Sequence, residues 1–256
     1  MTREHISRPR GWVVHRIGAL VAIAVGATMF GSETGAQQTQ GRHFALESAA
    51  GLQLHNVVAE PAVLQGRKGL RLTMSDEANR RLASMSPEEQ QQVEQLARIE
   101  GVEFGNGVIE AEVAGAPAPG APEGARGFVG IAFRLQQDMR TYDAFYLRPT
   151  NGRADDQERR NHATQYISHP DWPWFRLRKE TPSKYEAYVD LQPDVWTKIK
   201  IEVRAEHARL YVNDQAQPTL VVNDVKSGPQ ARGAVALWLD RSTVAHFHSL
   251  SVQTDR

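Results

Sequence analysis

The feature that most constrains the fold is an alternation of apolar and polar residues with a period of two. In residues 196–204 (WTKIKIEVR), Ile199, Ile201 and Val203 share one face, and the lysines and Glu202 between them share the other. Successive side chains of a strand point to opposite faces, so this segment predicts a strand with one buried and one solvated face. Turn-forming residues follow the next alternating run (ARLYVND), so residues 196–213 predict an antiparallel hairpin that turns near residues 206–207.

Five further segments show the same alternation, each bounded by turn residues. They are residues 107–113, 127–135, 142–148, 232–239 and 245–252. Short strands at regular spacing predict an all-β fold, a two-sheet antiparallel sandwich. Residues 114–126 (AGAPAPGAPEGAR) carry three prolines and three glycines, which predicts a long loop because proline cannot donate a hydrogen bond to a β-ladder.

One segment breaks the β pattern and predicts a helix inserted at the edge or side of the sandwich. In SPEEQQQVEQLARIEG, Ser86 can cap the Glu89 amide, Pro87 suits the first helical turn and Gly101 can end the helix. We expect this helix to span residues 87–100, with a narrow apolar stripe of Val93, Leu96 and Ile99.

The first 36 residues have the layout of a secretory signal peptide. Four arginines precede the apolar run of residues 17–30 (IGALVAIAVGATMF), and the small residues Thr34 and Ala36 follow it. The alternative is a retained membrane anchor, but this run is shorter than the roughly 20 residues that a spanning helix needs. We therefore expect residues 1–36 to be a signal peptide, residues 37–256 to form one domain, and that domain to be periplasmic or secreted.

Composition narrows the classes of partner and the source of stability. Residues 37–256 hold 26 Lys/Arg and 28 Asp/Glu, and this net charge of −2 argues against a nucleic-acid partner. The chain contains no cysteine, so its stability depends on buried apolar surface and not on disulfides. No long apolar run follows Phe30, so no membrane span is expected after signal removal.

Taken in order, the strand motifs FGNGVIEAEV, GFVGIAFR, YDAFYLRP, WTKIKIEV, LYVND and GAVALW resemble the concanavalin A-like lectin/glucanase superfamily. The chain is most similar to its laminin-G-like jelly rolls and to the domain of 3-keto-disaccharide hydrolases, over residues 44–252. The resemblance implies a two-sheet jelly roll whose concave face binds or cleaves glycans in many members. Fold by itself does not decide between binding and cleavage.

The chain departs from the glucanases of this superfamily at their catalytic strand. Neither E-x-D-x-E nor E-x-D-x-x-E occurs in the sequence, and the nearest string is Glu110-Ala111-Glu112. This spacing places both carboxylates on one strand face, as a retaining glycosidase requires. Two carboxylates on the solvated face of a half-buried strand are the simpler interpretation.

Residues 148–180 are the strongest candidate for a functional segment. They hold seven Arg/Lys, five Asp/Glu, two His and four aromatic residues between two predicted strands. Aromatic rings and planar polar groups suit a sugar ligand, and loops on a rigid scaffold commonly carry sites. An extended chain would place Trp172, Trp174 and Arg176 on one face. The candidate ligand-binding residues are Arg148, Asn151, Arg153, Arg159, Arg160, Asn161, Gln165, Tyr166, Trp172, Trp174, Arg176 and Arg178.

A structural interpretation of this segment stays open beside the functional one. The arginines could pair with Asp155, Asp156, Glu158 and Glu180 and order the loop without any ligand. If the segment is catalytic, His162 or His169 is the candidate acid or base, with Asp155 or Asp156 to orient it.

Two metal sites are conceivable from the sequence. Asn151, Asp155 and Asp156 offer oxygen ligands to calcium, although their spacing matches no EF-hand loop. His246 and His248 share a strand face but have no identifiable third ligand.

The sequence thus supports three hypotheses of different classes. The leading one is an exported jelly-roll protein that recognises a glycan or sugar derivative through residues 148–178. The alternatives are a hydrolase of glycosidic bonds, similar to 3-keto-disaccharide hydrolases, and a structural or adhesion module without a small ligand.

Overall fold

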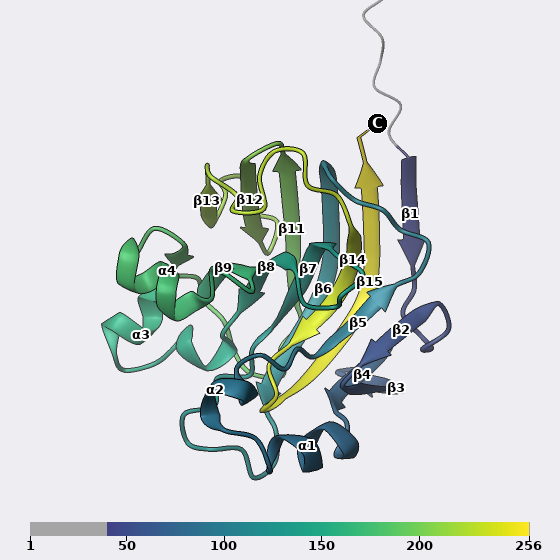
Figure 1. The fold of residues 1–256 in the computed structure, drawn as a ribbon, viewed down its shortest axis with the longest axis vertical. Coiled ribbons are helices and arrows are strands. Elements are labelled where there is room, and N and C mark those ends of the chain that lie inside the picture. The colour runs from purple at the N-terminus through teal and green to yellow at the C-terminus, as the bar shows by residue number, and fades with distance from the viewer. Residues whose placement is uncertain (1–39, 256) are drawn as a thin grey trace, which may run out of the picture. The chain divides into compact units, whose positions relative to one another are not determined.

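The computed structural model describes residues 40–255, and these residues form two antiparallel sheets that face each other (Figure 1). The predicted signal peptide lies outside the described residues. Sheet A has the strand order β13-β12-β11-β6-β15-β4-β3, with β1 paired to β15. Its strands are β1 (Gln40–Phe44), β3 (Val57–Leu64), β4 (Arg67–Met74), β6 (Gly107–Pro117), β11 (Thr197–Arg204), β12 (His207–Val212), β13 (Leu220–Val222) and β15 (Thr243–Thr254).

Sheet B has the order β10-β9-β8-β7-β14-β5-β2. Its strands are β2 (Leu52–His55), β5 (Leu96–Ile99), β7 (Val129–Leu135), β8 (Tyr142–Leu147), β9 (Thr164–His169), β10 (Glu186–Ala187) and β14 (Ala234–Leu239). The helices are α1 (Asp76–Leu82), α2 (Pro87–Gln90), α3 (Gln157–Asn161) and α4 (Trp174–Glu180), with a 3₁₀ turn η1 (Pro149–Asn151). The all-β, two-sheet sandwich predicted from the sequence is confirmed.

The two sheets differ in how their faces are covered. Strand β11 alternates between buried and half-buried residues, so the outer face of sheet A is in contact with solvent. Every residue of β7, β8 and β14 is buried, so the central strands of sheet B are covered on both faces. One hydrophobic core lies between the sheets. The second face of sheet B is therefore covered by helices and connecting segments, and this cover is where a site can be enclosed.

The predicted hairpin and strands are present with small changes in their bounds. Strands β11 and β12 pair from Ile199↔Val212 to Arg204↔His207, and the turn between them includes Ala205 in the left-handed region at φ 52°. Strand β6 continues to Pro117, so the proline-rich loop begins four residues later than predicted. Glu110 and Glu112 share the half-buried outer face of β6, as their spacing predicted, and Glu112 forms an ion pair with Arg67.

The helix predicted for residues 87–100 is wrong in its extent. Ser86 does form the expected capping box with Glu89, but α2 ends at Gln90. Leu96–Ile99 instead form β5, which pairs with β14 on one side and with β2 on the other. Tertiary pairing overrides a weak helical preference here, because β5 buries Leu96, Ala97 and Ile99 in the core. The helix α1 was not predicted. Ser75 caps it, and its residues Ala78 and Leu82 pack with Met74 in a small separate cluster.

Among residues 40–255, no helix combines the length and the apolar character needed to cross a bilayer.

Candidate functional site

The covered face of sheet B encloses a cavity of about 290 Å³ that we call the aromatic cavity. None of its lining residues belongs to a strand of sheet A. Its apolar wall consists of Phe128, Tyr146, Ile167, Trp174, Phe175 and Trp238, and its polar lining includes Gln90, Glu94, His169, Asp240 and Arg241. Small-molecule sites are commonly of this kind, with aromatic walls and a few placed polar groups, at volumes from about 300 Å³ upward.

Three of the aromatic rings form a continuous stack at the floor of the aromatic cavity. The Tyr146 ring lies 4.7 Å from the Trp238 ring and 5.3 Å from the Phe128 ring, both in stacked geometry. Burial raises the pKa of Tyr146 to about 12, and the neighbouring Arg148 only partly offsets this effect. The phenol is therefore neutral at physiological pH. Because Tyr146 and Trp238 are at most 7% exposed, the floor is fixed by packing.

Helix α4 supplies part of the wall, at a place where the sequence had suggested a strand. The chain is helical from Trp174 to Glu180, so Trp172, Trp174 and Arg176 do not share a strand face. Leu177 anchors the helix in the core, which leaves Trp174 40% exposed in the wall of the cavity. Trp172 lies elsewhere: it packs against the core and is covered by Arg176, whose guanidinium carbon is 3.9 Å from the ring centroid. The predicted double-tryptophan platform is absent.

At one end of the aromatic cavity, four polar side chains form a hydrogen-bonded chain. Trp238 Nε1 donates to the Tyr142 hydroxyl at 2.9 Å, and that hydroxyl donates to Glu94 Oε2. His169 Nδ1 lies 2.7 Å from Glu94 Oε1. Burial, followed by the charge of Glu94, raises the pKa of Tyr142 well above its ordinary value, so the phenol stays a donor. Nδ1 of His169 is thus hydrogen-bonded to Glu94. The His169 side chain is 15% exposed and lines the cavity.

A second polar group, the arginine cluster, borders the same face of sheet B. It consists of Arg148, His162, Gln165, Arg178 and Glu186. Arg148 is buried and donates to Glu186 (3.1 Å), Gln165 (2.8 Å), the Tyr146 hydroxyl (3.0 Å) and the His162 carbonyl (3.0 Å). Arg178 donates to both oxygens of Glu186. Buried ionic groups of this kind need such complete pairing.

The pKa values of the arginine cluster fix its charge. Burial alone would raise the pKa of Glu186, but the hydrogen bonds from Arg178 and the charge of Arg148 hold it below its ordinary value. Burial lowers the pKa of His162, and this effect outweighs the attraction of Glu186, whose Oε2 lies 2.8 Å from His162 Nδ1. The cluster therefore holds two guanidinium groups, one carboxylate and a neutral imidazole at pH 7.

The charged side chains of residues 148–180 mostly pair with partners outside that segment. Only Arg176 finds a predicted partner, Glu180, at 2.8 Å. Arg153 forms a bidentate pair with Asp190, and Arg160 donates to the Tyr188 hydroxyl. Arg159 has no carboxylate partner among the described residues. Arg148, Arg153 and Arg178 thus pair with carboxylates, as the structural interpretation expected. Their partners are Glu186 and Asp190, which the sequence analysis did not name.

The predicted histidine–aspartate pairs do not form. Asp155 and Asp156 are exposed, and Asp156 caps α3 by accepting from the Arg159 amide at 2.7 Å. The acidic partners of His169 and His162 are Glu94 and Glu186 instead. Of the other predicted residues, Asn161 is exposed and accepts from Gln157, and Tyr166 is buried and donates to Asp143.

The structure gives the surroundings of the predicted metal ligands. Asn151 is buried and donates to the His162 carbonyl at 3.0 Å, away from solvent-exposed Asp155. His246 and His248 share one face of β15, as predicted, and flank Trp196 edge-on. Within residues 40–255, no group of three or more His, Cys, Asp or Glu side chains is placed to hold a metal ion.

Of the predicted site residues, His169 and Trp174 line the aromatic cavity, and the sequence did not indicate its other lining residues as site residues. Phe128, Tyr146 and Trp238 were assigned only to strands, and Glu94 to a helix. One signal was available: the i, i+4 spacing of Tyr142 and Tyr146 on a strand places both on one face, together with Arg148 two residues later.

No family model matches the chain, and no curated protein sequence matches it. Solved structures do match. A protein of unknown function with a galectin-like fold from Bacillus subtilis aligns at a TM-score of 0.50 and 12% identity, over 84% of this chain and 96% of that one. The carbohydrate-binding module CBM66 from Bacillus subtilis aligns at 0.48 and 10% identity, over 77% and 92%. A Bacillus licheniformis beta-glucanase aligns at 0.42 and 14% identity, over 84% and 98%.

At these identities the likeness is one of fold. The galectin-like fold of the first of these structures agrees with the two-sheet jelly roll that the sequence resemblance implied.

Proposed function

We propose that this protein binds a carbohydrate in the aromatic cavity. The observation that carries the proposal is the combination of a stacked aromatic floor, an aromatic wall at Trp174 and polar side chains in the same lining. The apolar C–H face of a sugar ring packs on an aromatic ring, and its hydroxyl groups need hydrogen-bond partners at the ring edge. Trp174, which is 40% exposed, and the half-buried Phe128 offer the first kind of contact, and His169, Asp240 and Arg241 offer the second.

The proposal replaces the binding surface expected from the sequence. Residues 148–180 contribute Trp174 and His169 directly, while Arg148 and Arg178 act one layer behind the cavity. The guanidinium carbon of Arg178 lies 4.8 Å from the Trp174 ring centroid and that of Arg148 lies 5.9 Å from it. Two cations above one indole hold the ring in place, each by about 0.5–1 kcal/mol at exposed sites. The arginine cluster thus positions the cavity wall.

The test is a binding screen on a glycan array, followed by titration of the sugars that bind. Trp174→Ala should weaken binding about tenfold, equal to about 1.4 kcal/mol, because it removes one stacking wall. Because the Trp174 ring contacts two guanidinium groups, the variant should lose a little stability, so binding is measured well below the melting temperatures of both proteins. Tyr188→Ala is the matched control, an aromatic residue of 43% exposure outside the cavity. Equal losses in both variants, or no binding to any glycan, would contradict the proposal.

A second candidate function, hydrolysis of a glycosidic bond, is favoured by the geometry of His169. With Nδ1 bound to Glu94, Nε2 is the nitrogen left to accept a proton from a water that attacks the anomeric carbon, and to give that proton to the leaving sugar oxygen as the glycosidic bond breaks. Glu94 would orient the imidazole and stabilise its protonated form, as acidic residues do behind catalytic histidines. A 3-keto-disaccharide, the substrate class that the sequence resemblance implied, is the first compound to assay.

Variants separate this candidate from simple binding. If the protein is a hydrolase, His169→Gln should lower kcat by about 10²–10⁴-fold, far more than it weakens sugar binding, because glutamine keeps a hydrogen-bonding group at this position. Glu94→Gln should also lower kcat and move the acid limb of the pH–rate profile, which a purely structural role would not do. His207→Gln, at an exposed histidine on β12, should have no effect. Unaltered turnover in His169→Gln would exclude the mechanism.

The place of action follows from the same proposal. We infer that the protein acts on its carbohydrate outside the cytoplasm, because residues 1–36 have the pattern of a secretory signal peptide. Detection of a mature chain that starts near Gln37 in the periplasm or medium would support this inference.

A further inference from the structure

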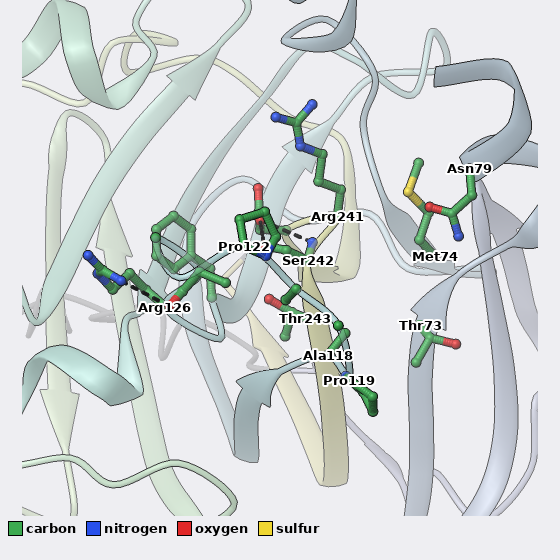
Figure 2. Close-up of a pocket in the computed structure, with 16 residues that line it drawn as sticks. Thr73, Met74, Asn79, Ala118, Pro119, Pro122, Arg126, Arg241, Ser242 and Thr243 are labelled. Atoms are coloured by element: carbon green, nitrogen blue, oxygen red, sulfur yellow. Dashed lines mark hydrogen bonds between the residues drawn. The ribbon is translucent and has the colours of Figure 1, made fainter. Parts of the chain in front are cut away.

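A second hollow, of about 550 Å³, shares part of its lining with the aromatic cavity, and Figure 2 shows the residues that line this hollow. The proline-rich loop of residues 118–126, Asn79 at α1 and residues 240–243 at the start of β15 form its walls. Three residues, Phe128, Asp240 and Arg241, line both the hollow and the aromatic cavity. A ligand in either space can therefore contact these three side chains.

Hydrogen bonds hold the walls of the second hollow in place. The Ala118 amide donates to the Ser242 carbonyl at 2.8 Å, which ties the loop to β15. Turns within the loop are closed by Ala121 N to Ala118 O at 2.9 Å and by Ala125 N to Pro122 O at 2.8 Å. Asp240 accepts from the Ser242 hydroxyl at 2.8 Å, which holds its carboxylate at the boundary between the two spaces.

The second hollow also contains a polar group that lacks a partner. Thr243 lines the hollow and is 1% exposed, yet its hydroxyl forms no hydrogen bond with any described residue. A buried hydroxyl without a partner costs roughly 1–3 kcal/mol, so native proteins seldom leave one. Figure 2 shows Thr73, Asn79, Ser242 and Thr243 around the same space, so hydroxyl and amide groups are prominent among its labelled side chains.

We propose that the second hollow is a further saccharide subsite, so that the ligand is a chain of several sugar units running from the aromatic cavity past Phe128 and Asp240. This inference rests on the proposed function. The aromatic cavity binds one part of the chain by ring stacking. The hollow binds the continuation through hydroxyl and amide groups, with Thr243 as one of the partners.

The experiment uses the full chain and gluco-, xylo- and arabino-oligosaccharides of two to six units, titrated calorimetrically. Affinity should rise at least tenfold from the shortest to the longest member of the series that binds. Thr243→Val, which keeps the shape and removes the hydroxyl, should reduce this gain severalfold and leave the shortest ligand unaffected. Its melting temperature should not fall, because the lost hydroxyl has no partner in the unliganded protein.

Two further variants complete the test. Thr197→Val removes a hydroxyl of another buried threonine, on β11, and should leave the length dependence unchanged. Because the chain contains no cysteine, Ala121→Cys creates a single thiol in the wall of the hollow. Its reaction with a bulky maleimide should abolish the gain from longer chains but not the binding of short ones.

The outcomes separate the two proposals. Short ligands that bind with no gain from length, and with no effect of the maleimide, would overturn the subsite and leave the proposed function standing. Failure of every oligosaccharide to bind would overturn the subsite, and failure of every glycan on the array as well would overturn both. A lower melting temperature in Thr243→Val with unchanged length dependence would show that the hydroxyl is structural, which also overturns the subsite.

Discussion

Asp224 shows how a single carboxylate joins distant parts of the chain. One of its oxygens accepts hydrogen bonds from Lys184 (2.8 Å), Lys226 (2.8 Å) and the Tyr185 hydroxyl (2.7 Å). Lys226 in turn lies 4.8 Å from the ring centroid of Trp172. Burial alone would raise the pKa of Asp224, but the three hydrogen bonds outweigh this effect and hold the pKa at about 2.

This depressed pKa predicts a pH-dependent loss of stability in Asp224→Asn. The folded pKa lies below the unfolded value of 3.8, so the contribution is complete above pH 4 and is lost as the pH falls toward 2. The side chain is 39% exposed, and solvent screening limits the effect at pH 7 to about 1 kcal/mol. Urea unfolding of both proteins between pH 2.5 and 7 should show a difference that shrinks with falling pH.

The control for this prediction is Asp155→Asn, at an exposed aspartate that forms no ion pair among the described residues. It should leave stability nearly unchanged at every pH. A difference between Asp224→Asn and the parent that stays constant across the range would show that the effect is not electrostatic.

The proline-rich loop is the element that decides the shape of the second hollow. Its base is closed by a close approach of β6 to the residues before β7. A Cβ on Gly127, which has φ +67°, would lie 2.8 Å from Ala116 backbone atoms. A Cβ on Gly115 would collide with the Gly127 carbonyl oxygen. Only glycine permits this contact, so two glycines fix where the loop leaves and rejoins the sandwich.

Gly127→Ala should therefore lower stability and weaken the binding of long ligands. A strained left-handed residue costs of the order of 1–3 kcal/mol, and the backbone contact adds to this cost. Thermal unfolding measures the first effect and the affinity ratio of long to short oligosaccharides the second.

Gly124→Ala is the matched control in the same loop, since a Cβ added at Gly124 would have no other atom within 4 Å. It should be neutral or slightly stabilising. Equal behaviour of the two variants would contradict the role given to Gly127.

At the scale of the whole molecule, one core joins the two sheets. Residues from both sheets, among them Val113, Phe133, Phe145 and Phe247, belong to a single buried cluster. The helices and connecting segments that enclose the aromatic cavity are anchored to the same unit by Leu177 and Tyr185. The cavity should therefore persist for as long as the sandwich is folded.

This arrangement predicts one cooperative unfolding transition for residues 40–255. Far-ultraviolet circular dichroism reports the sheets, and tryptophan fluorescence reports Trp172, Trp174, Trp196 and Trp238. Both signals should change at the same urea concentration, because the main core spans both sheets and the cover of sheet B is anchored in it. An earlier fluorescence transition would show that the cover of sheet B opens independently.

The sequence by itself determined the strands β6, β7, β8, β11, β12, β14 and β15, the hairpin of residues 196–213, the Ser86 capping box and the jelly-roll fold. Each of these depends on residues close together in the chain, or on the order of such local patterns. The end of α2 at Gln90 and the helix at Trp174 were decided by tertiary contacts, because β5 pairs with two distant strands and Leu177 enters the core.

The partners of the site residues were also decided only by the tertiary structure. Glu94 and His169 are 75 positions apart, and Arg148 and Glu186 are 38 apart. Arg134, which has φ 56°, is buried with donors to the carbonyls of Gly105, Ala205 and Gly228, which no local pattern specifies. Side-chain period is a property of neighbouring residues, whereas a site depends on which strands the fold places side by side, and that order is set by the packing of the whole core.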